Sequence, residues 1–194
     1  MSAHLFNIDN PRWKILRTKL TPTFTSGKMK MMFGTVCDVG EKFVKTLGIE
    51  AAQAVDNVIE VKDISARFTT DVIGSVSFGL DCSSLEDPQN LFRTNAKRLF
   101  DNPLHSAAFI QLALMFKSTA RKLHVRNFRK DATDFFFGIV KDTIEYRIKN
   151  KVHRNDFLQL LIQMIKTDGQ SNDDTEKFTI EEIGAQAFIF FLAG

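Results

Sequence analysis

The chain has 194 residues and a formal net charge of +3, with 25% charged and 44% hydrophobic residues. These values are typical of one globular unit and exclude a disordered or fibrous chain. Its 19 phenylalanines against one tryptophan and one tyrosine indicate a large apolar interior, and its lysines and arginines alternate with acids, which argues against nucleic acid as a partner.

The first half of the chain is predicted to form three helices and one short strand. Asp9-Asn10-Pro11 is an Asx cap followed by proline at the first helical position, and Thr21-Pro22 breaks the helix that it starts. The predicted elements are, in order, a helix from Pro11 to about Leu20, an amphipathic helix from Ser26 to at least Leu47, a short strand at residues 58–61, and a helix capped by Asp63 that runs to about Phe78.

The second half is also predicted to be helical. The segment 104–123 is hydrophobic but irregular and is harder to assign than the rest, and the acidic stretch 167–177 is typical of a surface loop. The predicted helices are a shorter one around residues 91–100, a long one from about Arg129 to Lys149, and one capped by Asp156 that runs to about Lys166. The fold class is therefore mainly α, with at most the short strand at 58–61.

The last predicted helix is apolar on every side. Thr179 and Glu182 form a capping box (Thr-x-x-Glu) that starts it, and it continues to Phe188-Ile-Phe-Phe-Leu-Ala-Gly194. A helix of this kind is normally buried, so we expect it to be the central helix of a larger fold. The chain is expected to be cut within this element; the alternative is that Gly194 is the glycine that follows a helix end.

Trp13 and Arg17 are the first candidates for a binding site. They stand four residues apart, on one face with Leu16 and Leu20. An unpaired guanidinium on a buried apolar face is strongly unfavourable, so this face should meet a carboxylate of the protein or of a cofactor. Arg17 would grip the carboxylate with two hydrogen bonds while Trp13 donates its indole N–H. The alternative is an ordinary aspartate or glutamate beside a packed tryptophan.

Four ordered blocks of sequence, which together cover essentially the entire chain, carry a resemblance to a known family. The blocks are Trp13-Lys-Ile-Leu-Arg17 running into Leu20-Thr-Pro-Thr-Phe-Thr-Ser-Gly-Lys-Met-Lys30, then Ala66-Arg-Phe-Thr-Thr-Asp-Val-Ile-Gly74, Arg154-Asn-Asp-Phe-Leu158 and Ala185-Gln-Ala-Phe-Ile-Phe-Phe-Leu-Ala-Gly194. They resemble the cytochrome P-450 family, the haem-thiolate monooxygenases, and most closely its insect microsomal branch associated with detoxification. The resemblance implies the helical fold of that family. Residues 1–194 would be a middle part of its catalytic domain, without the N-terminal anchor and the C-terminal haem-cysteine region.

The resemblance assigns roles to both ends of the chain. Trp13 and Arg17 would bind the propionates of haem, which supplies the carboxylate partner expected above. Ala193 and Gly194 would open the oxygen-binding groove, whose acid and threonine would follow them. Helical spacing puts Ile189, Leu192 and Ala193 on one face, and we expect them to line the substrate cavity above the iron. Ordinary core packing is the alternative for these three residues.

In this family the haem iron is held by a cysteine thiolate in a loop near the C-terminus of the protein. Neither Cys37 nor Cys82 lies in a loop of that kind, and neither has neighbours at metal-ligand spacing, so no metal ligand is predicted. We interpret both as buried core thiols. Because the thiolate favours O–O cleavage, the chain alone is expected to be inactive.

The resemblance further implies a function and a location. The function is a haem-dependent monooxygenase that inserts one oxygen atom of O2 into small apolar compounds: xenobiotics, plant toxins, insecticides or endogenous lipids and hormones. The full-length protein would lie on the cytosolic face of the endoplasmic reticulum membrane, with the segment 102–123 as a roof of the pocket that often faces the membrane, although no anchor or signal is present in this sequence.

Partners follow from the same resemblance. An NADPH-dependent reductase would supply electrons, and the cations expected to form its docking face are Arg12, Lys14, Lys19, Lys28 and Lys30. A merely solvated basic face is the alternative. A different class of function also remains: a complete, non-enzymatic all-helical module that sequesters apolar ligands or binds a partner helix.

Overall fold

The computed structural model describes residues 3–101, 103–123, 125–126, 128–168 and 177–193. Within these ranges the chain is helical and contains no β-strand, which confirms the mainly α fold class. The helices are α1 (Arg12–Leu20), α2 (Ser26–Gln53), α3 (Val61–Ile73), α4 (Leu91–Asp101), α5 (Ala107–Met115), α6 (Lys117–Lys122), α7 (Lys130–Asn150), α8 (Phe157–Asp168) and α9 (Ile180–Ala193), with short turns η1 (Thr21–Phe24), η2 (Val55–Asn57) and η3 (Gly74–Phe78).

The prediction of a short strand at residues 58–61 is wrong. Val58 has extended backbone angles (φ −101°, ψ 126°), but α3 already begins at Val61. The carboxylate of Glu60 accepts a hydrogen bond from the backbone N–H of Lys62 at 3.1 Å and so caps α3, a role that we had expected of Asp63. Because no second strand lies in the described residues, an extended segment here has nothing to pair with.

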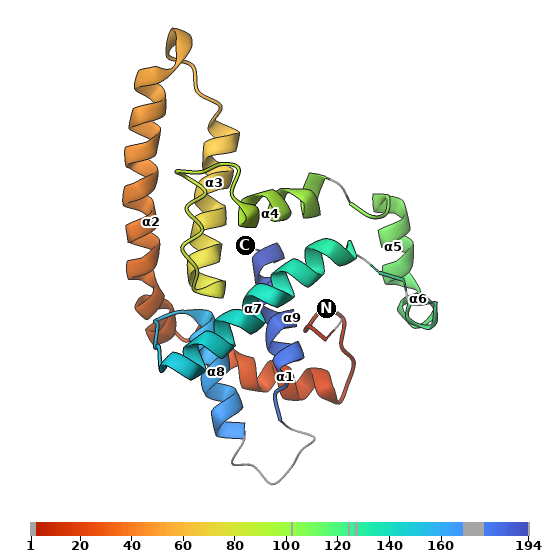
Figure 1. Cartoon of the computed structure of the whole chain (residues 1–194). Helices are drawn as coiled ribbons and strands as arrows, with labels where there is room; N and C mark the ends of the chain where they lie inside the picture. Colours follow the sequence, from red (N-terminus) through yellow and green to blue (C-terminus); the bar gives the residue numbers. More distant parts are fainter. Residues whose placement is uncertain (1–2, 102, 124, 127, 169–176, 194) are drawn as a thin grey trace.

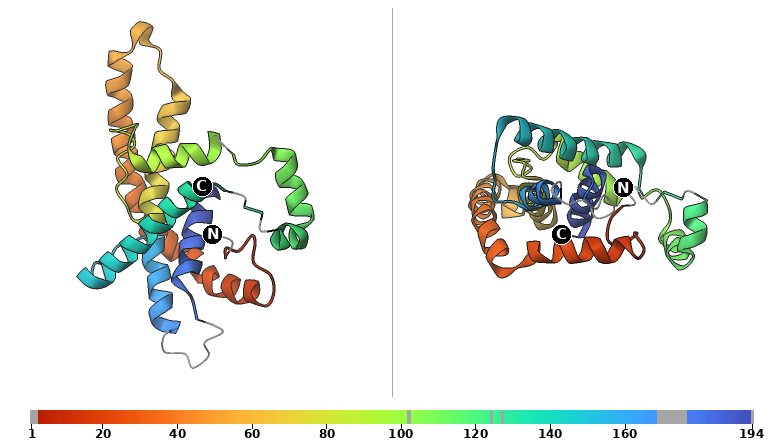
Figure 2. Two further views of the ribbon diagram at one scale, coloured as in Figure 1. Left: turned by 45° about the vertical axis from the view of Figure 1, so that its right-hand side comes forward. Right: turned by 90° about the horizontal axis from the view of Figure 1, so that it is seen from below.

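Helix α9 lies between two layers. Seen from below, α1 runs along one side of α9 and α7 along the other, with α8 beside α9 in the middle layer (Figure 2). The hairpin of α2 and α3 stands on one flank of this core, and α5 and α6 lie apart on the opposite flank (Figure 1). The apolar side chains of α9 that are completely buried are those of Ile183, Ala185, Ala187 and Phe188. The expectation of a buried central helix is therefore confirmed.

Phenylalanine rings from four elements close the centre of the core. Phe136 of α7 stacks on Phe191 of α9 with ring centroids 4.9 Å apart, and Phe92 of α4 meets Phe191 edge-on at 5.6 Å. Phe78 of η3 and Phe188 of α9 complete the cluster. Full burial of one such ring contributes about 1.5–3 kcal/mol, so this cluster is a major part of what holds the layers together.

Capping signals marked several helix starts correctly. The box that opens α9 is present: Thr179 Oγ1 accepts from the N–H of Glu182 at 3.1 Å, and Glu182 Oε2 accepts from the N–H of Thr179 at 3.1 Å. Asp156 Oδ1 accepts from the N–H of Gln159 at 2.8 Å at the start of α8. By contrast, the cap position of α1 is Pro11 and no side chain caps it there.

The irregular segment 104–123 forms α5 and α6. Ser106 caps α5 by accepting from the N–H of Phe109, and no residue of α5 is buried. The side chains of Leu112, Met115 and Phe116 are all more than half exposed. The sequence of α5 is apolar except for Gln111, so it carries no periodicity that could have predicted a helix. Among the described helices, none combines the length and the apolar composition that crossing a bilayer requires.

The turn between α7 and α8 contains a buried ion pair. Arg147 donates to Asp156 through Nη1 to Oδ1 at 2.8 Å and through Nη2 to Oδ2 at 2.6 Å, and both side chains are 3% exposed. Gly79 passes directly over this pair in the left-handed region (φ 65°), and a β-carbon there would overlap both the guanidinium and the carboxylate. The ion pair can therefore pack this closely against residue 79 only because that residue is a glycine.

Two glycine substitutions test this fit. Gly79→Ala should lower the free energy of unfolding by about 3 kcal/mol or more, because it strains the backbone and displaces a buried ion pair. Gly138→Ala, in the middle of α7 with open space around it, should raise stability by about 0.5–1 kcal/mol. Urea denaturation followed by circular dichroism measures both. Equal stability of Gly79→Ala and the parent protein would contradict this description of the turn.

Candidate functional site

Helix α1 presents Trp13 and Arg17 to solvent. Leu16 and Leu20 on one edge of its apolar stripe are buried, with exposed fractions of 0% and 2%, whereas Trp13 is 37% exposed and Arg17 is exposed. The premise that Arg17 lies on a buried face is therefore wrong. No ion pair or side-chain hydrogen bond joins its guanidinium to another residue in the part of the chain that the structure describes. An adjacent indole and guanidinium thus face outward with their donors available.

Arg12, one residue before Trp13, is committed to α9. Its Nε donates to Oε1 of Glu182 at 2.6 Å, its Nη2 donates to Oε2 of the same carboxylate, and Nη2 also donates to the carbonyl of Lys177 at 2.6 Å. The side chains of Arg12 and Glu182 are 22% and 8% exposed. Arg12 was expected to be an exposed docking cation, and this expectation is wrong because its guanidinium is occupied by a buried carboxylate.

The other four cations of the expected docking face differ in exposure. Lys14 and Lys30 are exposed, while Lys19 and Lys28 are half-buried. Lys14 and Lys19 lie on α1, and Lys28 and Lys30 lie on α2, on the other side of the break between the two helices. The surface therefore remains basic, but without the charge of Arg12, which is paired with Glu182.

The segment before α1 also lies against α9. Gln186, fully buried one turn after Glu182, accepts from the N–H of Leu5 at 3.3 Å and donates to the carbonyl of Ala3 at 3.0 Å. His4, between these two residues, is 6% exposed, and its Nδ1 has no hydrogen-bond partner among the described residues. Burial lowers the pKa of His4 to about 4, so its ring is neutral at pH 7.

A cleft of about 730 Å³ lies between α3, α4 and the last turn of α9. Leu192 and Ala193, both predicted to contact substrate, are in its wall. Ile189, the third predicted residue, is half-buried and is not part of this wall, and Gly194 lies outside the described residues. The apolar side of the cleft consists of Ala66, Ile73, Ala96, Phe100, Phe191, Leu192 and Ala193.

The polar side of the cleft carries no net charge. Its acidic and basic side chains are equal in number: Glu60, Asp63 and Asp101 against Lys62, Arg93 and Lys97. Asp63 Oδ1 accepts from Arg93 Nη2 at 2.6 Å, and Lys97 lies 4.0 Å from Asp101. Opposite charges neutralise each other at this rim, so the cleft as a whole suits an uncharged, largely apolar ligand.

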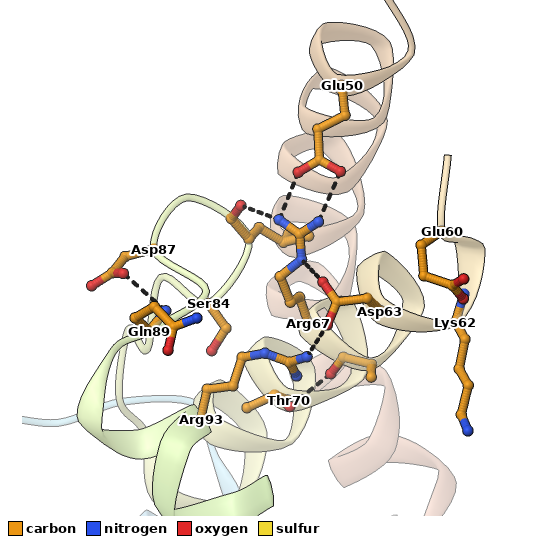
Figure 3. Close-up of polar contacts among 12 residues, drawn as sticks. Glu50, Glu60, Lys62, Asp63, Arg67, Thr70, Ser84, Asp87, Gln89 and Arg93 are labelled. Carbon is orange, nitrogen blue, oxygen red and sulfur yellow. Dashed lines mark hydrogen bonds and ion pairs between the residues drawn. The ribbon is translucent and has the colours of Figure 1, made fainter. Parts of the chain in front are cut away.

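A buried arginine behind this rim ties α2, α3 and α4 together (Figure 3). Arg67 is 5% exposed and contacts both oxygens of Glu50, through Nη1 to Oε1 at 2.7 Å and Nη2 to Oε2 at 2.8 Å. Its Nε lies 3.0 Å from Asp63 Oδ2, and Asp63 in turn pairs with Arg93 of α4. The hydrogen bond with Glu50 raises the pKa of Arg67, which therefore stays charged. The four-residue spacing of Asp63 and Arg67 was the one signal in the sequence for this cluster.

The two cysteines differ in environment. Cys37 on α2 is exposed, so its interpretation as a buried core thiol is wrong; only Met32 and Val39 are buried on that helix. Cys82 is half-buried, and burial, with the nearby charges of Asp71 and Asp81, raises the pKa of its thiol. Cys82 is therefore protonated at neutral pH and is not a thiolate. Among the described residues, no group of His, Cys, Asp and Glu side chains could hold a metal ion.

Comparison with known proteins gives a family match over the whole chain. Residues 1–194 match the profile of the family described as Cytochrome P-450. The chain is 45% identical over 194 residues to probable cytochrome P-450 6a20 of Drosophila melanogaster. It is 42% identical over 200 residues to cytochrome P-450 6a2 of the same species, and 39% identical over 194 residues to cytochrome P-450 6A1 of Musca domestica. These insect proteins confirm the resemblance that the four sequence blocks carry.

The matches cover all of this chain but only part of each relative. Each includes 100% of this chain but 38%, 39% and 38%, respectively, of the three relatives. The chain thus spans about two fifths of the length of the curated relatives that it matches.

Truncation along α1 separates binding residues from structural ones. Leu16→Ala and Leu20→Ala should each lower the free energy of unfolding by about 2–5 kcal/mol, because they leave cavities in the core. Trp13→Ala and Arg17→Ala should each change it by less than about 1 kcal/mol, since both side chains are exposed. Urea denaturation of the four variants measures this difference. A cost for Arg17→Ala as large as that for Leu16→Ala would show that Arg17 is a structural residue.

Proposed function

Since this chain belongs to the cytochrome P-450 family, we propose that the protein is a haem-dependent monooxygenase that inserts one oxygen atom of O2 into small apolar compounds. Such compounds include xenobiotics, plant toxins, insecticides and endogenous lipids or hormones. Residues 1–194 form part of its catalytic domain. The observation that carries the proposal is the outward-facing pair of Trp13 and Arg17, which lies on the helix that is tied to the buried α9.

The donor set of this pair fits the carboxylates of haem. A guanidinium offers five N–H donors in a fixed plane, and an indole offers one more. Trp13 and Arg17 stand one helical turn apart, about 6 Å along the axis of α1, and Arg17 has no carboxylate partner among the described residues. We assign them to the two propionates, with Arg17 forming a two-pronged, charge-assisted contact. Their role is to bind the cofactor and to fix its orientation.

Neither cysteine fits the iron ligand. Cys37 is exposed on the outer side of α2, and Cys82 is held as a neutral thiol beside Asp71 and Asp81. A thiolate ligand forms where positive charge or a metal lowers the pKa, which is the opposite environment. The ligand would therefore come from residues other than 1–194, and the chain by itself would be inactive. Bound haem supplies the redox chemistry with O2; the residues described here bind, orient and shield.

The cleft at the end of α9 supports an apolar substrate. Its volume of about 730 Å³ lies within the range of roughly 300–1,000 Å³ that is usual for small-molecule sites. Leu192 and Ala193 in its wall would contact the substrate, whereas Ile189, one turn earlier on α9, does not line the cleft. Ala193 with Gly194 would open the groove for O2. Phe100 and Phe191 would add aromatic surface for contact with the substrate.

The partners and the location of the protein complete the proposal. An NADPH-dependent reductase would dock on the surface that carries Lys14, Lys19, Lys28 and Lys30, without Arg12, whose charge is occupied. The protein would lie on the cytosolic face of the endoplasmic reticulum membrane. The exposed apolar side chains of α5, Leu112 and Met115 among them, support a membrane contact there.

Retention of haem tests the proposal in the full-length protein that contains this chain. Arg17→Ala should speed the transfer of haem to an excess of apomyoglobin by roughly 10- to 100-fold, the value of one or two hydrogen bonds to a charged group. Trp13→Phe should have a smaller effect in the same direction. Lys14→Ala, on the same helix, is the control and should transfer haem at the parent rate. If purified protein supplied with ample haem stays colourless, or Arg17→Ala retains haem as the parent does, the proposal fails.

A further inference from the structure

Resting on the proposed function, we infer that the contact between Arg12 and Glu182 is a positioning device: it sets the place of the Trp13–Arg17 pair relative to the cleft end of α9. Arg12 and Glu182 are therefore positioning residues for the cofactor, although neither would touch it.

The contact joins the first residue of α1 to the first turn of α9. Three hydrogen bonds from one guanidinium reach the carboxylate of Glu182 and the carbonyl of Lys177, which lie on either side of the start of α9. A planar fork held at three points fixes both the distance and the rotation of the helix that carries it. A single lysine ammonium could supply the charge but not this geometry.

Because α1 and α9 are helices, the contact at their starts also fixes the positions of residues further along each of them. At a rise of about 1.5 Å per residue, Arg17 lies about 7 Å along α1 from Arg12. Ala193 lies eleven residues after Glu182 on α9, which is about 16 Å along that helix. With the two helices joined at their starts, the distance between the Trp13–Arg17 pair and the cleft wall at Ala193 is fixed. Slippage of α1 by one turn would move Arg17 by about 5 Å, more than a hydrogen bond tolerates.

The burial of Glu182 makes the contact selective. Glu182 is 6% exposed, and its remaining partner is the N–H of Thr179 in the capping box. A buried carboxylate without a cation is strongly unfavourable, so any other placement of α1 leaves an unpaired charge inside the protein. Gln186, on the next turn of the same face of α9, holds Ala3 and Leu5. The polar side chains of α9 thus position both α1 and the segment before it.

A merely structural role predicts a different pattern of effects. A structural ion pair would lower the free energy of unfolding and leave haem affinity unchanged in the folded protein. A positioning contact lowers haem affinity beyond what the loss of stability explains. The pair of Arg147 and Asp156 is a matched control, since it is also buried and two-pronged but joins α7 to α8.

The experiment uses full-length, haem-loaded protein and measures haem transfer to apomyoglobin together with urea denaturation. Arg12→Gln and Glu182→Gln should each speed haem transfer by roughly tenfold, as is usual when a group that orients a ligand is removed. The double variant should transfer haem at about the rate of either single variant, because the two residues act through one contact. Arg12→Lys keeps a positive charge beside the buried carboxylate of Glu182 but loses the three-point contact of the guanidinium, so it should also speed haem transfer. Asp156→Asn should lower stability and leave haem transfer at the parent rate.

The outcomes separate this inference from the proposed function. If Arg17→Ala speeds haem transfer but Arg12→Gln, Arg12→Lys and Glu182→Gln do not, the positioning role is wrong and the haem site stands. If Asp156→Asn speeds transfer as much as Glu182→Gln, the effect reports only stability and the inference is again wrong. If Arg17→Ala itself has no effect, the assignment of the haem site fails instead.

Discussion

The structure depends on one constraint: α9 is apolar over most of its surface, and most of its length must be buried. Packing of α7 on one face, α1 on the opposite face, and α8 with η3 beside it meets this requirement. The approach of α7 is especially close at Gly184, where a β-carbon would lie 2.6 Å from the ring of Phe137. A larger residue would hold the layers apart and loosen the stacked phenylalanines. The size of the core therefore follows from the need to bury one helix, in agreement with the excess of phenylalanine in the sequence.

Burial of α9 also explains why its few polar side chains matter. Glu182 and Gln186 lie on one face, four residues apart, and each must find partners inside the protein. Both find them in the first seventeen residues of the chain, through Arg12, Ala3 and Leu5. Apolar packing alone would accept several placements of α1, because leucines slide past one another at small cost. The polar contacts select one of them, and Trp13 and Arg17 are placed as a result.

Local signals predicted much of this fold, and contacts between distant residues account for the rest. The capping box at Thr179 and the cap at Asp156 depend on neighbours in sequence, and both were predicted correctly. The β-branched residues around 58–61 suggested a strand, but Glu60 starts a helix there and no partner strand is described. Helix α5 was not predicted because a run that is apolar except for Gln111 shows no helical period.

For the candidate site, the sequence predicted that Trp13 and Arg17 share one helix face, but it did not predict that both are exposed. Leu192 and Ala193 line a cleft, and their contact with a substrate stays a prediction. The sequence could not predict that Arg12 is occupied, since its partner Glu182 lies 170 residues away.

A structure of the full-length protein with haem bound is the most direct test of the haem assignment. We expect the propionate oxygens to lie within hydrogen-bond distance of the Arg17 guanidinium and of the Trp13 indole N–H, with Arg12 still paired with Glu182. A haem whose propionates meet other residues, with Trp13 and Arg17 left in solvent, would contradict the assignment.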